Sequence, residues 1–146
     1  MDQRKQDQAT MNGWMEECHE PRIVARSARV LAINDDPVVH ERLRLVLEPQ
    51  HTMTCESSVM DAILRIVHGE RFDLILCSLD LPDMNGLDFL THMAAASPEH
   101  AERTVLMVSG TSAEESFQAA RSIGVPLLDT ARDVRYMRIL AGWYAR

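Results

Sequence analysis

The sequence contains a single lysine, Lys5, among its fifteen basic residues, so the other fourteen are arginines. No uncharged apolar run approaches the roughly 18 residues of a membrane span, and the first ten residues lack the apolar stretch of a secretory signal. The cysteines are few, odd in number and widely spaced: Cys18, Cys55 and Cys77. This pattern favours free thiols over a disulfide framework, so we expect a cytoplasmic protein without a membrane segment.

The composition is typical of one folded domain. Of the 146 residues, 46% are hydrophobic and 25% are charged, which excludes an extended disordered chain and provides enough apolar side chains for one core. A chain of this length makes one domain of about 100–150 residues. The net charge of −7 argues against a nucleic-acid-binding surface on the domain as a whole.

Residues 1–28 differ from the rest and are expected to be an N-terminal extension to a domain that spans 29–146. The first ten residues are almost entirely polar, and four apolar side chains then follow at the spacing of one helix face: Met11, Trp14, Met15 and Cys18. So short a stripe either docks on the body of the protein or pairs with a partner. The alternative is an unstructured leader with a chance pattern.

From residue 29 onward, short apolar runs alternate with segments of helical periodicity. Five runs are predicted to be strands: 29–33, 51–55, 73–77, 104–109 and 125–129. Continuous apolar runs such as 73–77 are typical of strands buried on both faces. No hairpin signal separates consecutive runs, so the strands are expected to be parallel, with helices on both faces of the sheet.

Local signals also predict where the helices begin and which faces they bury. Asp36 is expected to cap the first of them, Ser57 to open the helix after the second strand, and the last helix to begin near Asp133. The helix at 87–96 is predicted to turn three apolar side chains inward: Leu87, Leu90 and Ala94.

The segments around the predicted strand ends resemble the receiver domains of bacterial two-component response regulators. RVLAINDDP (29–37) resembles the family's first strand and acidic cluster, and DLILCSLDLPDMNGLDFL (73–90) resembles its third strand, phosphoacceptor loop and next helix. TVLMVSG (104–110) resembles its fourth strand and hydroxyl residue. The resemblance covers about residues 29–145. It implies a three-layer α/β fold with a five-stranded parallel sheet in the order 2-1-3-4-5, the receiver or flavodoxin-like arrangement.

The resemblance also implies a chemistry. In the family, carboxylates after the first and third strands hold Mg²⁺, which prefers oxygen ligands. A hydroxyl residue after the fourth strand and a lysine after the fifth bind the transferred phosphoryl group. These places fall here on seven residues at the carboxyl ends of the strands: Asn34, Asp35, Asp36, Ser78, Asp80, Ser109 and Thr130.

The phosphoacceptor position holds the wrong chemical group. Family members place the acceptor aspartate four residues before the proline of the loop, and counting back from Pro82 gives Ser78. A serine hydroxyl has neither the anionic nucleophile nor the acyl-phosphate chemistry of aspartate. The nearest carboxylate, on Asp80, stands where the family uses a backbone carbonyl as a metal ligand.

The acidic cluster is depleted as well. Asn34 takes the place of the first family carboxylate, Asp35 that of the second, and Asp36 that of an acidic helix cap. Only Asp35 is a residual candidate for weak Mg²⁺ binding, because this ion dehydrates reluctantly and needs several oxygen ligands. We therefore expect no cofactor, and Mg²⁺ only if the pocket works after all.

The phosphoryl-binding groups are incomplete too. The only lysine, Lys5, lies outside the receiver-like region, and Thr130 stands at the place of the family lysine. Ser109 alone matches the working pattern. These departures indicate a degenerate pseudo-receiver, without enzyme activity, that signals by protein contact.

The last segment of the chain is the candidate partner surface. Residues 129–146 carry four arginines against two aspartates, and receivers generally use the face of helix 4, strand 5 and helix 5 for dimers and effectors. Arg and Trp are enriched at interface hot spots. The expected partner is a histidine kinase, an effector or a second copy. The interface candidates are Arg135, Arg138 and Trp143, together with Met11, Trp14 and Met15 of the N-terminal stripe. The alternative is an ordinary solvated helix face.

Two other functions stay open at this point. One is an active receiver that is phosphorylated at an unusual residue, Asp80 or Ser78. The other is a flavin-binding protein of the same topology. The second needs a phosphate-binding loop after the first strand, and the acidic NDDP there would repel a phosphate.

Overall fold

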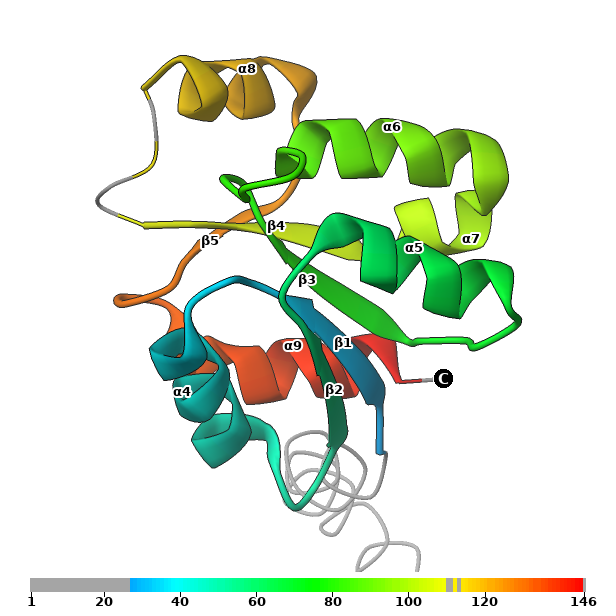
Figure 1. Cartoon of the computed structure of the whole chain (residues 1–146). Helices are drawn as coiled ribbons and strands as arrows, with labels where there is room; N and C mark the ends of the chain where they lie inside the picture. The colour runs from blue at the N-terminus through cyan, green and yellow to red at the C-terminus, as the bar shows by residue number, and fades with distance from the viewer. Residues whose placement is uncertain (1–26, 110–111, 113, 146) are drawn as a thin grey trace, which may run out of the picture.

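The computed structural model describes residues 27–109, 112 and 114–145, so the apolar stripe predicted around Trp14 lies outside the described residues. The chain forms one parallel sheet in the order β2-β1-β3-β4-β5, which confirms the predicted fold class and strand order (Figure 1). The strands are β1 (Arg29–Ile33), β2 (Thr52–Glu56), β3 (Leu74–Ser78), β4 (Thr104–Val108) and β5 (Leu127–Asp129).

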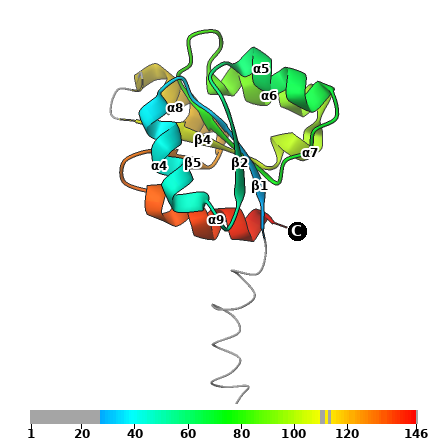
Figure 2. The same ribbon diagram turned by 60° about the horizontal axis from the view of Figure 1, so that its bottom comes forward.

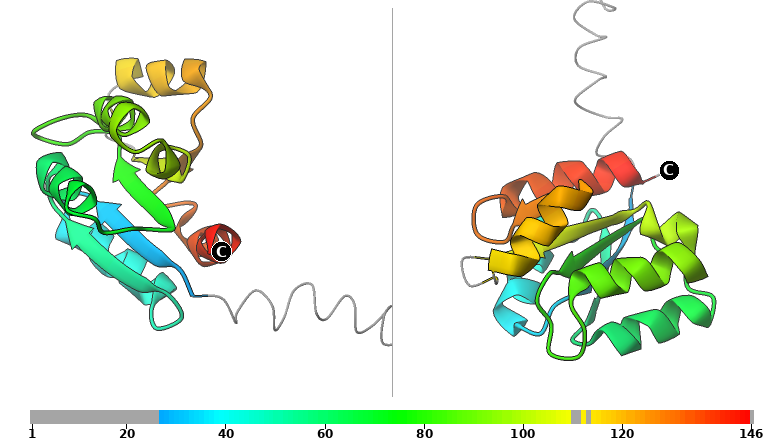
Figure 3. Two further views of the ribbon diagram at one scale, coloured as in Figure 1. Left: turned by 90° about the vertical axis from the view of Figure 1, so that its right-hand side faces the viewer. Right: turned by 90° about the horizontal axis from the view of Figure 1, so that it is seen from above.

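Helices cover both faces of the sheet and make three layers (Figure 3). One face carries α4 (Pro37–Leu47) and α9 (Met137–Tyr144), which lie side by side (Figure 2). The other face carries α5 (Val59–Val67), α6 (Gly86–Ala96) and α8 (Glu114–Ile123). A short helix, α7 (Pro98–Ala101), follows α6, and a 3-10 turn, η2 (Val134–Tyr136), leads into α9.

The two central strands, β1 and β3, bury side chains on both faces of the sheet. In β1, Leu31 packs into the core beneath α5 and α6, whereas Val30 packs into the core beneath α4 and α9. In β3, Ile75 and Leu76 divide between the two cores in the same way. Alternate side chains of a strand point to opposite faces, and a strand covered on both faces therefore needs apolar residues at every position.

Two predicted details of the helices on the α5 and α6 side are wrong. The N-cap of α5 is Ser58, whose side chain accepts from the Asp61 N–H, and Ser57 lies before it. The side chains that α6 buries are Phe89 and Met93. Of the predicted set, Leu87 is partly buried against the same core, whereas Ala94 is exposed. Apolar residues occur almost all round α6, so its periodicity did not identify the buried face.

The last helix also begins differently from the prediction. The 3-10 turn η2 precedes α9, so the α-helix starts at Met137 and not near Asp133. The Asp133 carboxylate accepts a hydrogen bond from the Asp129 N–H at 2.9 Å. That carboxylate therefore holds the turn after β5 closed.

Two histidines away from the carboxyl edge of the sheet act as hydrogen-bond acceptors. Nδ1 of His51 accepts from the Ala28 N–H at 2.9 Å, where the chain enters β1. Nε2 of His100 accepts from the Phe72 N–H at 3.0 Å, just before β3. Burial lowers the pKa of both imidazoles below the ordinary value of 6.5. Both hydrogen bonds require a neutral imidazole, because the accepting nitrogen must be unprotonated.

We expect the free energy of unfolding to fall as the pH drops below about 6.5. In that range the unfolded chain binds protons that the folded His51 and His100 resist, so protons favour unfolding. Urea titrations at pH 7.5 and 5.5 would measure the loss, and a His51→Gln/His100→Gln variant should show less of it. The exposed His92, changed to Gln, is the control and should leave the loss intact.

Within the described residues, no helix combines the length and the apolar character that crossing a membrane requires.

Candidate functional site

The carboxyl ends of β1, β3, β4 and β5 open onto one cavity of about 280 Å³. All seven residues that the sequence placed after the strands line it: Asn34, Asp35, Asp36, Ser78, Asp80, Ser109 and Thr130. Parallel strands present their carboxyl ends at the same edge of a sheet, which is why residues distant in sequence meet here.

The turn after β1 uses Asn34 as a structural residue. Its side-chain Oδ1 accepts from the Asp36 N–H at 2.8 Å, and its backbone oxygen accepts from Nε2 of His40 at 2.7 Å. Asp36 then caps α4, because its carboxylate accepts from the Val38 N–H at 2.9 Å. Asn34 is 5% exposed, whereas Asp35 is exposed and also lines the cavity. One acidic side chain of the turn is therefore free of a capping role.

At the end of β3, Ser78 bonds within its own loop. Its hydroxyl donates to the backbone oxygen of Asp80 at 3.1 Å. The Asp80 carboxylate oxygen Oδ2 is buried and has no hydrogen-bond partner among the described residues. The serine hydroxyl is thus bonded to the backbone oxygen of Asp80. One carboxylate oxygen of Asp80 has no donor among the described residues.

A glycine closes the same loop against β3. The Gly86 N–H donates to the Leu79 oxygen at 2.8 Å. A Cβ at this position would lie 2.7 Å from the backbone oxygen of Ser78 and 3.1 Å from the Cα of Leu79. Only a residue without a side chain lets the start of α6 approach the loop so closely.

We expect Gly86→Ala to lower the free energy of unfolding by about 1–3 kcal/mol, the usual cost of overpacking. A decrease in the free energy of unfolding would be informative, because replacing glycine by alanine in a helix otherwise stabilises the helix. Urea unfolding of the variant checks this expectation. An unchanged or higher unfolding midpoint would show that the loop moves away from α6 without cost.

The described residues directly after β4 and β5 contribute hydroxyl side chains to the cavity and no cationic side chain. The Ser109 N–H donates to the hydroxyl oxygen of Ser112 at 3.0 Å. Thr130 is 8% exposed, and its N–H donates to the Val108 oxygen at 2.9 Å. The threonine side chain therefore stands in the cavity where the family resemblance placed a lysine.

Sequence reasoning missed Arg42 and Ser112, which also line the cavity. Arg42 follows Val38 by four residues on α4, and this spacing puts both side chains on the helix face that borders the cavity. The spacing can be read from the sequence, but the sequence does not show that α4 lies at the strand ends, which brings Arg42 to the cavity. A cation therefore borders this site after all, from a different element than the family lysine.

Two of the oxygen ligands that the family resemblance implies for a divalent cation are altered in this cavity. Among the described residues, no three His, Cys, Asp or Glu side chains come close enough to hold a metal ion. The carbonyl of Asp80 is engaged by Ser78, and Asn34 supplies an amide in place of a carboxylate. Mg²⁺ requires near-octahedral oxygen ligands and is usually held by one or two well-placed carboxylates beside several waters.

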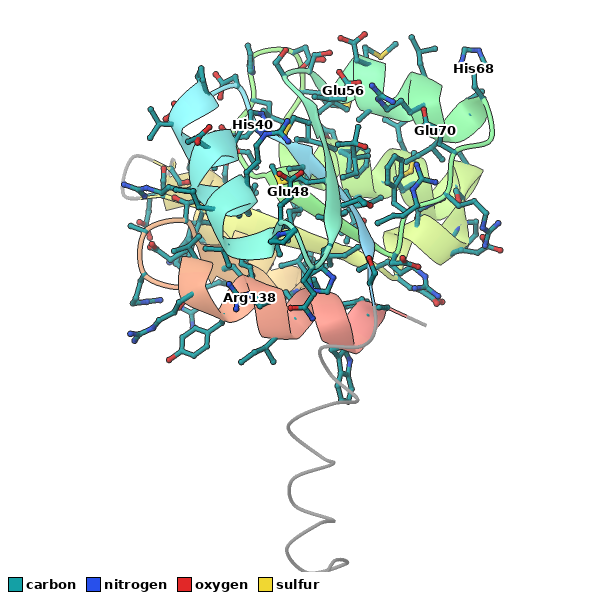
Figure 4. The ribbon with its side chains drawn as sticks, turned by 90° about the horizontal axis from the view of Figure 1, so that it is seen from below. His40, Glu48, Glu56, His68, Glu70 and Arg138 are labelled. Carbon is teal, nitrogen blue, oxygen red and sulfur yellow. The ribbon has the colours of Figure 1, made fainter. Side chains whose placement is uncertain are left out.

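The predicted interface residues of the last segment lie outside this cavity. Arg138 reaches from α9 to α4, where its Nε donates to the Val46 oxygen at 2.9 Å (Figure 4). The guanidinium carbon of Arg135 lies 5.2 Å from the centre of the Tyr136 ring, within the range of a cation–π contact. Trp143 is 68% exposed. The other interface candidates, Met11, Trp14 and Met15, are not among the described residues.

A doubly wound parallel sheet with acidic and hydroxyl side chains at its carboxyl edge defines the class of flavodoxin-like α/β domains. The family model described as response regulator receiver domain matches residues 30–126. The chain therefore belongs to the receiver domain family of two-component signalling systems.

Solved receiver structures share this fold at low sequence identity. A receiver domain protein from Clostridium thermocellum matches with a TM-score of 0.66 at 15% identity, covering 81% of this chain and 94% of that one. The receiver domain of the Francisella response regulator 1452 gives 0.64 at 15%, covering 81% and 96%. A CheY-like receiver domain protein from Methanospirillum hungatei gives 0.62 at 20%, covering 75% and 86%. No curated protein matches the sequence.

Proposed function

We propose that this chain is a pseudo-receiver that signals through protein contact, without aspartyl phosphorylation. The observation that carries the proposal is the hydrogen bond made by Ser78. This residue puts an uncharged side chain at the acceptor position, and its hydroxyl donates to the backbone oxygen of Asp80. A phosphoacceptor needs an anionic oxygen directed into the cavity, and this hydroxyl is directed into its own loop.

The electrostatics of the cavity support the same proposal. Phosphoryl transfer is catalysed almost entirely by positioning and by cations that neutralise the developing charge. Asn34 and Ser78 remove two of the anionic oxygens that would hold a metal, and Thr130 replaces the cation of the fifth strand. What remains are carboxylates of Asp35, Asp36 and Asp80 around an uncharged acceptor position.

We expect acetyl phosphate with millimolar Mg²⁺ to add no mass to the protein. The test is intact mass spectrometry after incubation, since a phosphoryl group adds about 80 Da. An Asn34→Asp/Ser78→Asp variant treated in parallel is the control for the phosphodonor and the metal. An adduct on the natural chain, mapped to Ser78 or Asp80, would overturn the proposal.

Phosphorylation at Asp80 is the second candidate, and one observation favours it. The Asp80 carboxylate borders the cavity, and its Oδ2 lacks a hydrogen-bond partner among the described residues. A carboxylate without donors is a better nucleophile than one already bonded. Mapping any adduct by fragmentation, with Asp80→Asn as the matched variant, separates this candidate from the first.

We further propose that the partner binds over α8, β5 and α9. Trp143 and Ile139 are exposed on α9 at 68% and 60%, and Arg135 is exposed on η2, the turn that leads into α9. Exposed aromatic and arginine side chains in one place are typical of interface hot spots. A histidine kinase, an effector or a second copy of this chain remain the candidate partners.

A further inference from the structure

An apolar groove runs along the outer face of α9. Its lining residues come from β5, η2 and α9: Leu128, Tyr136, Ile139, Leu140 and Trp143. Three of them are large side chains exposed to solvent, Tyr136 at 50%, Ile139 at 60% and Trp143 at 68%. The opposite face of α9 buries Met137 and Ala141 in the core, so this helix is apolar on both sides. Contiguous exposed apolar surface usually marks a binding site.

The N-terminal segment has the pattern of an occupant for this groove. Residues 11–18 carry apolar side chains at the spacing of one helix face: Met11, Trp14, Met15 and Cys18. This stripe covers eight residues, and α9 is itself eight residues long. As a helix the segment would extend about 12 Å, which matches the length of the groove-forming helix.

The chain enters the described domain beside α9. Ala28 is buried in the same core as Ala141 and Ala145 of α9, and the start of β1 lies next to the carboxyl end of that helix (Figure 2). Residues 19–26 separate this point from the apolar stripe. Eight residues can span up to about 26–29 Å, so the stripe can reach any part of the outer face of α9 without disturbing the fold.

The charges of the two surfaces are complementary. Residues 11–20 contain Glu16, Glu17 and Glu20 and no lysine or arginine. The cation at this surface is Arg135, whose guanidinium carbon lies 5.2 Å from the ring centre of the groove residue Tyr136. Arg135 forms no ion pair with a carboxylate of the described residues. Opposite charges at the rim of an apolar contact favour its orientation.

We propose that residues 11–18 dock in cis in the groove of α9 and cover part of the partner face. The regulatory meaning rests on the proposed function, since a partner would have to displace the segment before it contacts Trp143. The docking itself does not depend on how the acceptor position behaves.

The two tryptophans of the chain report on the two sides of this contact, because Trp14 lies in the segment and Trp143 in the groove. In a full-length Trp143→Phe variant, Trp14 is the only tryptophan and should be shielded from acrylamide quenching. Adding Ile139→Asp to the groove should raise its quenching constant several-fold and shift its emission to longer wavelength. Adding Leu64→Asp, a matched change at a 46% exposed leucine of α5, should have no effect.

A second experiment uses Trp143, in the groove, as the fluorescent probe of the same contact. In a full-length Trp14→Phe variant, Trp143 is the only tryptophan, and Met15→Asp should expose it to acrylamide although the change is outside the described domain. If Ile139→Asp and Met15→Asp leave both quenching constants unchanged, the segment does not dock. If the shielding appears only as the protein dimerises in sedimentation experiments, a second copy fills the groove and the cis proposal is wrong. The acetyl phosphate experiment is independent of these readouts, so the two proposals fail separately.

Discussion

Replacing Asn34 and Ser78 by aspartate is expected to make the chain a slow acceptor of phosphoryl groups. Asn34→Asp keeps the Oδ1 that accepts from the Asp36 N–H and exchanges the amide nitrogen for a second anionic oxygen. Ser78→Asp removes the hydroxyl that occupies the Asp80 carbonyl and returns a nucleophilic carboxylate. With Asp35, three carboxylates then surround one cation, which is a set that Mg²⁺ accepts.

Adding Thr130→Lys to this double variant should raise the rate of phosphorylation. A lysine there places a positive charge where the transferred phosphoryl oxygens accumulate negative charge. A restored preorganised contact of this kind contributes about 2–4 kcal/mol, or about 30- to 900-fold in rate. Time courses of acetyl phosphate labelling, followed by intact mass, measure both variants under the same conditions.

Arg42 provides the internal control for that comparison. Its side chain borders the cavity from α4 and could supply part of the missing positive charge. If it does, Arg42→Gln in the double variant should slow labelling further, and the gain from Thr130→Lys should be smaller than a full lysine contact. A triple variant that takes up no phosphoryl group at all would contradict the assignment of Ser78 to the acceptor position.

Features set by short stretches of sequence were predictable. Asp36 caps α4, and β3 is buried on both faces, because a cap or a strand depends on a few neighbouring residues. The gathering of Ser78 and Thr130 in one cavity followed from parallel topology. The family resemblance supplied the role expected of each position.

Features set by three-dimensional packing were not predictable. The buried face of α6 depends on how the helix lies on the sheet, since its apolar residues leave several faces equally plausible. The bond between Ser78 and Asp80 needs the actual path of the loop. Arg42 reaches the cavity only because α4 crosses the strand ends. The groove of α9 combines residues from three elements, and periodicity within one element cannot show it.

In metal-free buffer, the Asn34→Asp/Ser78→Asp variant is expected to be less stable than the natural chain. The cavity already holds the carboxylates of Asp35, Asp36 and Asp80, and two more would be crowded among them. Like charges held close disfavour ionisation, and the folded state bears this cost while the unfolded chain does not. We expect a loss of about 1–3 kcal/mol in the free energy of unfolding, measured by urea titration.

Mg²⁺ should reverse that loss in the variant and leave the natural chain unchanged. A ligand that binds only the folded state stabilises it by about 2.7 kcal/mol when its concentration is 100 times the Kd. The natural cavity has an amide at position 34 and a hydroxyl at position 78 where the variant has carboxylates to bind the ion, so its urea midpoint should not respond. Ser78→Ala, which frees the Asp80 carbonyl without adding charge, tests whether that carbonyl alone suffices, and we expect no Mg²⁺ effect. Equal stabilisation of the natural chain and the double variant would show that the native cavity is still a metal site, and Asn34 and Ser78 would then not be inactivating substitutions.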